Sequence, residues 1–140
     1  MLLPTILVVD DDAGVRDLVV RSVQRLGHES RMASTGSEAL AALRKERVDL
    51  VIADVYMPDM DGIEFLQRLT QEPVQPKVIV ISGGGYEERE SVLERAAHLG
   101  ATMTMEKPFT PQQLVDAIRQ TLGVGKKEAG KKEAGKKKKK

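Results

Sequence analysis

Five side chains of types that bind metal ions and phosphate each stand at or just beyond the end of a short apolar segment. Asp10 and Asp11 follow the first segment, Asp54 the second, Ser82 the third and Lys107 a more polar fourth. Carboxylate oxygens are ligands that suit Mg²⁺, and a divalent ion together with an ammonium group would offset the repulsion between the acids. If folding gathers these residues, the expected chemistry is attack of the Asp54 carboxylate on phosphorus, with cations stabilising the phosphoryl oxygens. The product would be an acyl phosphate.

The apolar segments must be strands if these side chains are to meet. They are rich in β-branched residues and too short for independent helices, so we predict strands over residues 5–9, 50–53, 78–81 and 101–105. A weaker and more polar strand is predicted near residues 29–33. In an open α/β sheet, ligands bind in the crevice outside the carboxyl ends of the strands. The polar residues that follow the strands should therefore share one pocket.

Segments with helical periodicity lie between the predicted strands and can cover the faces of a sheet. Their expected starts carry capping-box patterns, and their expected ends carry a glycine suited to the left-handed conformation. The starting residues are Thr35, Asp61 and Thr110, with Pro111 at a first helical position, and the glycines are Gly27, Gly100 and Gly123. Fivefold alternation of strand and helix implies a parallel sheet covered on both faces. Periodicity does not give the spatial order of the strands.

The length of 140 residues fits one domain. The absence of cysteine excludes disulfides and thiolate metal sites, and it fits a reducing compartment. The sequence shows neither a secretory signal nor an apolar stretch near the roughly 20 residues that span a bilayer. These features predict a soluble cytoplasmic protein without an integral membrane segment.

The charge is divided unevenly along the chain. Residues 123–140 hold nine lysines and two glutamates, a charge of +7, and the whole chain carries +1, so residues 1–122 carry −6. The repeated Lys-Lys-Glu-Ala-Gly pattern predicts an unfolded tail, because its like charges repel and its glycines weaken a helix. The tail could simply be solvated, or it could bind a polyanion such as nucleic acid.

Each candidate residue also has an ordinary structural interpretation. Asp12 immediately precedes a predicted helix and suits a helix cap. Asp54 alone could begin a turn, as is expected of Asp59, and Ser82 before three glycines could be a turn hydroxyl. Lys107 alone could be a surface cation. Only their joint placement favours a common site.

Four motifs together resemble the receiver domain of two-component response regulators, over about residues 4–122. The motifs are Val8-Val9-Asp10-Asp11, Asp54-x-x-Met57-Pro58-x-Met60-Asp61-Gly62, Ile81-Ser82-Gly83 and Lys107-Pro108-Phe109. The resemblance implies a flavodoxin-like (βα)5 fold, a three-layer α/β sandwich around a five-stranded parallel sheet. It also implies a receiver domain over residues 1–122, followed by the tail.

The resemblance further implies a role for each candidate residue. Asp54 would be the phosphoacceptor, and a Mg²⁺ ion would be held by Asp10, Asp11, Asp54 and the main-chain carbonyl of Tyr56. Ser82 would bind a phosphoryl oxygen. Lys107 would pair with the phosphate, and its bond to Pro108 would be cis. The donor would be a phosphohistidine on a sensor histidine kinase or a histidine phosphotransfer protein.

The chain departs from the receiver pattern at two places. Receivers commonly carry an aromatic residue three positions before the lysine, whereas this chain has Thr104, which excludes an aromatic rotamer switch there. The loop from Gly83 to Gly85 is rich in glycine and is expected to be mobile before phosphorylation. By resemblance, Tyr56 and Gly84 flank the line of water attack on the acyl phosphate, and the surface of the fourth helix, fifth strand and fifth helix is the candidate for output.

Several functions fit this sequence. The leading hypothesis is a stand-alone receiver, a signalling phosphoacceptor rather than an enzyme, that changes its affinity for a downstream protein. A phosphorelay shuttle or phosphate sink uses the same chemistry, and a polyanion binder acting through the lysine tail belongs to another class. A phosphatase with Asp10 as nucleophile and Asp12 as acid would normally carry a hydroxyl residue where this chain has Gly14. His28 and His98 are expected to face solvent, without partners for a phosphohistidine role.

Overall fold

The computed structural model describes residues 3–57, 59–82 and 94–123. Within these ranges strands and helices alternate along the chain, and residues 94–98 are also helical. The strands are β1 (Thr5–Val9), β2 (Glu29–Ala33), β3 (Leu50–Asp54), β4 (Lys77–Ser82) and β5 (Met103–Glu106). The helices are α1 (Ala13–Arg25), α2 (Gly36–Lys45), α3 (Gly62–Leu69) and α5 (Pro111–Leu122). The lysine-rich residues 124–140 lie outside the described ranges.

All five strands are parallel and form one sheet in the order β2-β1-β3-β4-β5. From β1 the chain passes to one neighbour, β2, and then returns to the other side of β1 to form β3. The carboxyl ends of β1 and β3 are therefore the point at which the strand order reverses, where open α/β sheets bind ligands. The predicted five-stranded parallel sheet of the flavodoxin-like fold is confirmed.

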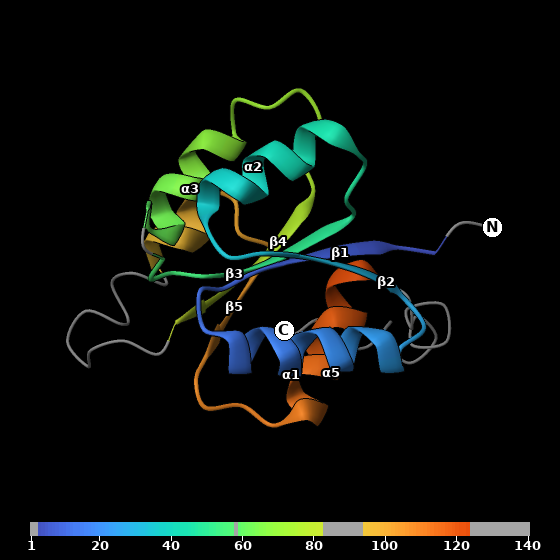
Figure 1. Ribbon diagram of the computed structural model, residues 1–140. Coiled ribbons are helices and arrows are strands. Elements are labelled where there is room, and N and C mark those ends of the chain that lie inside the picture. The colour runs from blue at the N-terminus through green and yellow to red at the C-terminus, as the bar shows by residue number, and fades with distance from the viewer. Residues whose placement is uncertain (1–2, 58, 83–93, 124–140) are drawn as a thin grey trace.

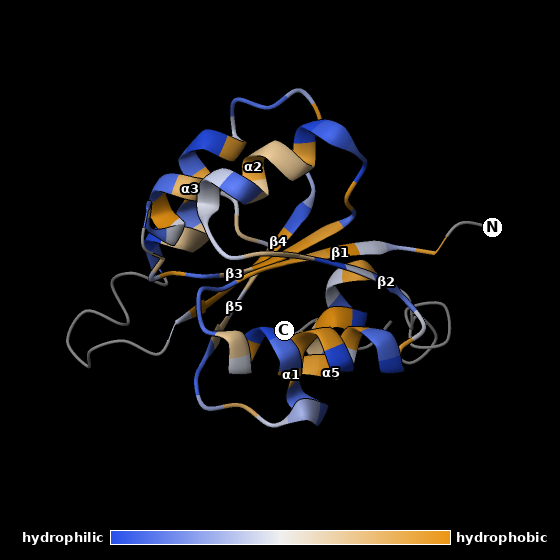
Figure 2. Cartoon of the chain, viewed as in Figure 1, coloured by the Kyte–Doolittle hydropathy of each residue, from blue (hydrophilic) through white to orange (hydrophobic). Residues whose placement is uncertain are grey.

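Helices cover both faces of the sheet, with α2 and α3 on one side and α1 and α5 on the other (Figure 1). Side chains of the three central strands alternate between these layers, and all of those named next are at most 1% exposed. Leu7, Val9, Val51, Ala53 and Val80 pack with α2 and α3, whereas Ile6, Val8, Leu50, Ile52 and Ile79 pack with α1 and α5. Burial on both faces explains the nearly continuous apolar strands, which appear orange between the two helix layers in Figure 2.

The predicted helix ends agree with the structure. Thr35, Asp61 and Thr110 each accept a hydrogen bond at a helix start, and Thr110 forms a full capping box with Gln113. Such caps each contribute about 1 kcal/mol. Gly27, Gly100 and Gly123 have φ values of 81°, 105° and 74°, a region that favours glycine.

The strand boundaries differ slightly from the prediction. The last strand begins at Met103 rather than at residue 101, because the Ala101 amide donates to Ala96 and so closes the preceding helix. The strands β3 and β4 each extend one residue further and include Asp54 and Ser82. The sheet itself therefore holds both of these predicted site residues.

The two histidines differ in their environment. His98 is exposed as predicted, but the prediction is wrong for His28, which is half-buried just beyond the end of α1. Both of its ring nitrogens are buried without a hydrogen-bond partner among the described residues. Burial, and then the charge of Arg119, lower the pKa of His28 below 6.5.

None of the helices among the described residues has the length and hydropathy needed to cross a membrane.

Candidate functional site

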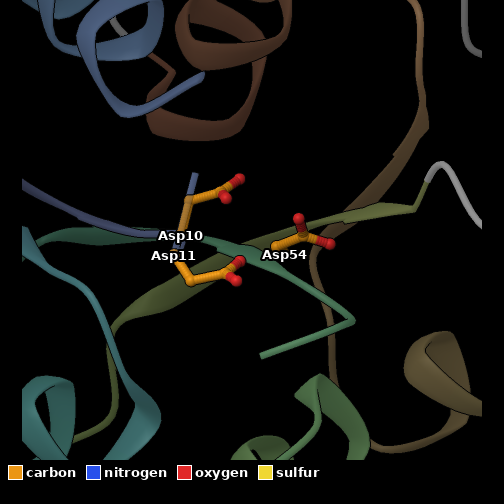
Figure 3. A group of neighbouring side chains, drawn as sticks. All are labelled: Asp10, Asp11 and Asp54. Carbon is orange, nitrogen blue, oxygen red and sulfur yellow. The ribbon is translucent and has the colours of Figure 1, made fainter. Parts of the chain in front are cut away.

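Three carboxylates meet where the strand order reverses. Asp10 directly follows β1, Asp11 comes next, and Asp54 is the last residue of the neighbouring strand β3. Figure 3 shows the three side chains extending over the same edge of the sheet, and one oxygen from each lies within 4.8 Å of the others. Asp10 and Asp54 are only 2% and 6% exposed, whereas Asp11 is exposed. This is a hard-oxygen site of the kind that suits Mg²⁺.

Main-chain groups fix the two buried carboxylates. The Asp12 amide donates to Oδ1 of Asp10 at 2.9 Å, and the Tyr56 amide donates to Oδ1 of Asp54 at 3.1 Å. The side chain of Arg16 reaches back from α1 and donates from Nη1 to the Asp10 carbonyl at 2.8 Å. The site is therefore built from the strand ends and the first residues of the loops that follow.

Burial makes this acidic cluster costly without a cation. Burial raises the pKa of Asp10 to about 6, the Asp12 amide opposes that rise, and the Asp54 charge adds to it. Two carboxylates about 4 Å apart repel by about 4 kcal/mol at an effective dielectric of 20. The site thus favours a divalent cation, and its donor atoms fit one.

Lys107 supplies a resident positive charge. Its Nζ lies 2.9 Å from Oδ2 of Asp54 and 3.8 Å from Oδ2 of Asp10. Burial lowers the pKa of Lys107, but the hydrogen bond and charge of Asp54, followed by the charge of Asp10, outweigh burial and leave it raised. The peptide bond from Lys107 to Pro108 is cis, as the resemblance implied.

Ser82 completes the set from the next strand. It ends β4, one residue beyond Ile81, which pairs with Asp54 across the sheet. Ser82 is 0% exposed, and its Oγ has no hydrogen-bond partner among the described residues. Burying a hydroxyl that has no hydrogen-bond partner costs free energy. Such a hydroxyl is suited to donate a hydrogen bond to an oxygen of an incoming group.

Asp12 caps a helix, whereas Tyr56 lies next to the carboxylate cluster. Asp12 is the cap of α1, as expected, and its carboxylate accepts from the amides of Gly14 and Val15 at 2.8 and 3.2 Å. Tyr56 is 43% exposed and its amide faces the site. The role of its carbonyl as a metal ligand stays a prediction.

Pro58 and residues 83–93, which include the predicted glycine-rich loop from Gly83 to Gly85, lie outside the described residues. Thr104 lies half-buried in β5 and pairs with Val80. A hollow of about 510 Å³ lies beside the site. It is lined by Met105, Glu106, Lys107, Pro108, Phe109 and Gln113.

Sequence reasoning missed two residues that contact the site's loops. Arg16 supports the Asp10 carbonyl, and Asp59, expected to begin a turn, bonds instead to the start of α2. For Arg16 the available signal was its place on the first turn of a predicted helix, six residues after Asp10. For Asp59 no local signal exists, because its partners lie more than 20 residues away along the chain.

The fold and the site define a parallel α/β domain with a cluster of carboxylates, suited to hold a cation, at the reversal of its strand order. A family model, the response regulator receiver domain, matches residues 6–119. The chain belongs to this family, whose members act as phosphoacceptors in two-component signalling.

Relatives and solved structures agree with this assignment. The chain is 34% identical over 122 residues to sporulation initiation phosphotransferase F of Bacillus subtilis, covering 87% of this chain and 96% of that protein. It is 38% identical over 117 residues to the probable transcriptional regulator ycf27 of Pyropia yezoensis, covering 84% of this chain but 46% of that protein. The chain thus spans about half the length of several regulators that it matches.

The chemotaxis response regulator CheY4 of Vibrio cholerae has a similar structure, with a TM-score of 0.77 at 30% identity, covering 86% of this chain and 99% of that chain. A response regulator from Chloroflexus aurantiacus gives a TM-score of 0.79 at 31% identity, covering 86% of this chain and 98% of that chain. These likenesses extend over nearly all of the described body.

Proposed function

We propose that this receiver accepts a phosphoryl group on Asp54 from a phosphohistidine of a sensor kinase or phosphotransfer protein, and then changes its affinity for a downstream protein. The observation that carries the proposal is the contact of 2.9 Å between Lys107 Nζ and Asp54 Oδ2, beside two further carboxylates. A nucleophilic carboxylate, a fixed cation and a cluster of metal-binding oxygens together are the parts that phosphoryl transfer requires.

The phosphoryl transfer forms one bond to phosphorus and breaks another. A carboxylate oxygen of Asp54 forms a bond to phosphorus, the bond between phosphorus and the imidazole nitrogen of the donor breaks, and the imidazole leaves with that electron pair. Lys107 stabilises negative charge on the transferred group, and the Ser82 hydroxyl, which has no partner within the described ranges of the chain, donates to one of its oxygens. The Asp54 acyl phosphate is the product.

The acidic residues are suited to hold the metal ion. Asp10, Asp11 and Asp54 would supply carboxylate ligands, and the Tyr56 carbonyl is the proposed fourth protein ligand. A bound Mg²⁺ would add positive charge near the phosphoryl oxygens. Removal of Mg²⁺ with a chelator should therefore abolish phosphorylation.

Mass spectrometry after incubation with a small phosphodonor and Mg²⁺ tests the proposal. The wild type should gain one phosphoryl mass on Asp54, and Asp54→Asn should gain none. Asp116→Asn, which changes an exposed carboxylate on α5, is the matched control and should match the wild type. Equal labelling of Asp54→Asn and wild type would overturn the assignment of Asp54.

A phosphorelay shuttle is the second candidate. It is favoured by the match to sporulation initiation phosphotransferase F, of which the chain covers 96% at 34% identity. A shuttle should pass its label to a histidine phosphotransfer protein faster than the acyl phosphate hydrolyses. Hydrolysis without onward transfer to any candidate acceptor would favour the signalling receiver.

We also propose that the receiver body ends near Leu122 and that residues 123–140 form a separate tail. Support comes from the family match, which ends at residue 119, and from α5, which ends at Leu122. Limited proteolysis should release the lysine-rich end and leave the body intact. The predicted stand-alone form is tested by the intact mass of the protein isolated from its host.

A further inference from the structure

Asp59 connects the loop after the phosphoacceptor strand to a different helix. Its Oδ1 accepts from the Gly36 amide at 3.0 Å, and its Oδ2 accepts from the Ser37 amide at 2.9 Å. The Ser37 hydroxyl also donates to Oδ2, at 2.6 Å. The loop between β3 and α3 is therefore bonded to the start of α2.

This bond completes the start of α2. The first amides of a helix have no partners within it. In α2, the Glu38 amide donates to Thr35 Oγ1, and Asp59 accepts from Gly36 and Ser37. The Ser37 hydroxyl lowers the pKa of Asp59 to about 2 despite desolvation, with help from the amides of Ser37 and Gly36. Asp59 is thus charged at physiological pH.

Packing reinforces the same connection. Met60 is 7% exposed and lies directly on Gly36, where an added Cβ would meet Met60 Cγ at 2.5 Å and Sδ at 2.9 Å. The absence of a side chain at Gly36 lets the loop approach α2 this closely. Asp59 and Met60 therefore fix the same part of the loop in two independent ways.

The anchored part of the loop also closes back onto β3. The Gly62 amide donates to the Val55 carbonyl at 2.6 Å, and a Cβ at Gly62 would meet Val55 Cα at 2.8 Å and the Asp54 carbonyl oxygen at 3.1 Å. Between these anchors and the strand lies Tyr56, whose amide bonds Asp54 Oδ1. The main chain of Tyr56 is thus held from both sides.

We propose that Asp59 is a positioning residue for the metal site, which acts by tying the Tyr56 main chain to helix α2. The proposal rests on the proposed function, in which the Tyr56 carbonyl is a Mg²⁺ ligand. Mg²⁺ demands near-ideal octahedral geometry at short distances, whereas Ca²⁺ accepts flexible geometry. Loosening the loop should consequently weaken Mg²⁺ binding more than Ca²⁺ binding.

The test measures Mg²⁺ and Ca²⁺ dissociation constants by calorimetry for folded wild type, Asp59→Ala and Ser37→Ala. Asp59→Ala removes all three hydrogen bonds and should weaken Mg²⁺ binding about tenfold. A loss of this size is typical when a group that orients a metal ligand is removed. The Ca²⁺ affinity of this variant should fall by a smaller factor. Ser37→Ala removes only the hydroxyl bond and should give an intermediate loss of Mg²⁺ affinity.

Thr35→Ala is the matched control. It removes a cap from the same end of α2, the bond of 3.1 Å from the Glu38 amide, without touching the loop. It should therefore lower stability but leave Mg²⁺ affinity unchanged. Equal Mg²⁺ affinities for Asp59→Ala and Thr35→Ala would show a purely structural role and overturn the positioning role alone. A wild type that binds no Mg²⁺ would overturn the proposed function and this inference with it.

Discussion

Lys107 Nζ lies 2.9 Å from Oδ2 of Asp54 and 3.8 Å from Oδ2 of Asp10. One ammonium group from the segment between β5 and α5 thus contacts carboxylates at the carboxyl ends of two adjacent strands. The Lys107 side chain is 28% exposed, and the two acids are almost fully buried. The cation thus partly balances the acidic cluster before any metal binds.

Replacing Lys107 by methionine should destabilise the metal-free protein. The change keeps most of the side-chain length and leaves two buried carboxylates without their cation. We expect a loss of about 1–2 kcal/mol in the free energy of unfolding near neutral pH, between the values for exposed and buried pairs. Urea unfolding with and without Mg²⁺ measures this, and Mg²⁺ should restore part of the loss. An unchanged unfolding midpoint without metal would contradict the balancing role.

Replacing Asp10 by asparagine should stabilise the metal-free protein. The pKa of Asp10 is raised by burial from 3.8 to about 6, so the folded protein holds this proton more tightly than the unfolded chain. Protonation of Asp10 thus contributes to the free energy of unfolding. This contribution is fully present below about pH 4 and is lost as the pH rises to about 6.

Asp10→Asn should therefore stabilise the metal-free protein at neutral pH by about 1–3 kcal/mol, with a difference that shrinks toward pH 4. Urea unfolding of both proteins across this pH range is the measurement. Saturating Mg²⁺ should stabilise the wild type more than the variant, because the variant lacks one carboxylate ligand. A variant that is less stable than wild type at neutral pH would argue against a costly buried charge at this position.

The sequence was sufficient to predict the elements and their polar ends because those features are local. Periodicity marks a buried strand, a capping box marks Thr110, and an acidic residue after a strand marks Asp10 or Asp54. The family resemblance added the roles that are expected of Ser82 and Lys107. What the sequence did not reveal depends on contacts between distant segments.

The bonds of Asp59 to α2 and the burial of His28 are examples of such contacts. Asp59 occurs in a turn-rich stretch, and nothing in its neighbours indicates a partner 22 residues earlier. His28 follows Gly27 at a helix end, where exposure is the usual outcome, but both of its ring nitrogens are buried in the folded chain. Strand order has the same origin, since it depends on which strands pair rather than on their composition.

Replacing Ser82 by alanine should separate stability from phosphoryl binding. The Ser82 hydroxyl is buried and, among the described residues, has no partner, so its removal should leave the stability of the unphosphorylated protein unchanged or raise it by up to about 1 kcal/mol. Affinity for beryllofluoride, a phosphoryl mimic, should fall about tenfold, as expected for loss of one hydrogen bond to a charged group. Thermal unfolding and calorimetry measure the two quantities. A large loss of stability in Ser82→Ala would indicate that the hydroxyl is already bonded in the free protein.

Replacing His28 by leucine should stabilise the protein most at acidic pH. Burial, together with the charge of Arg119, lowers the pKa of His28 below 6.5, so the unfolded chain binds this proton more readily than the folded protein does. The wild type therefore loses stability as the pH falls below 6.5, and His28→Leu does not lose that part. The difference in the free energy of unfolding should grow as the pH falls through this range. His98→Leu, at an exposed position, is the control for the loss of one histidine. If the difference in unfolding free energy between His28→Leu and wild type stays constant with pH, the His28 ring protonates as readily in the folded protein as in the unfolded chain.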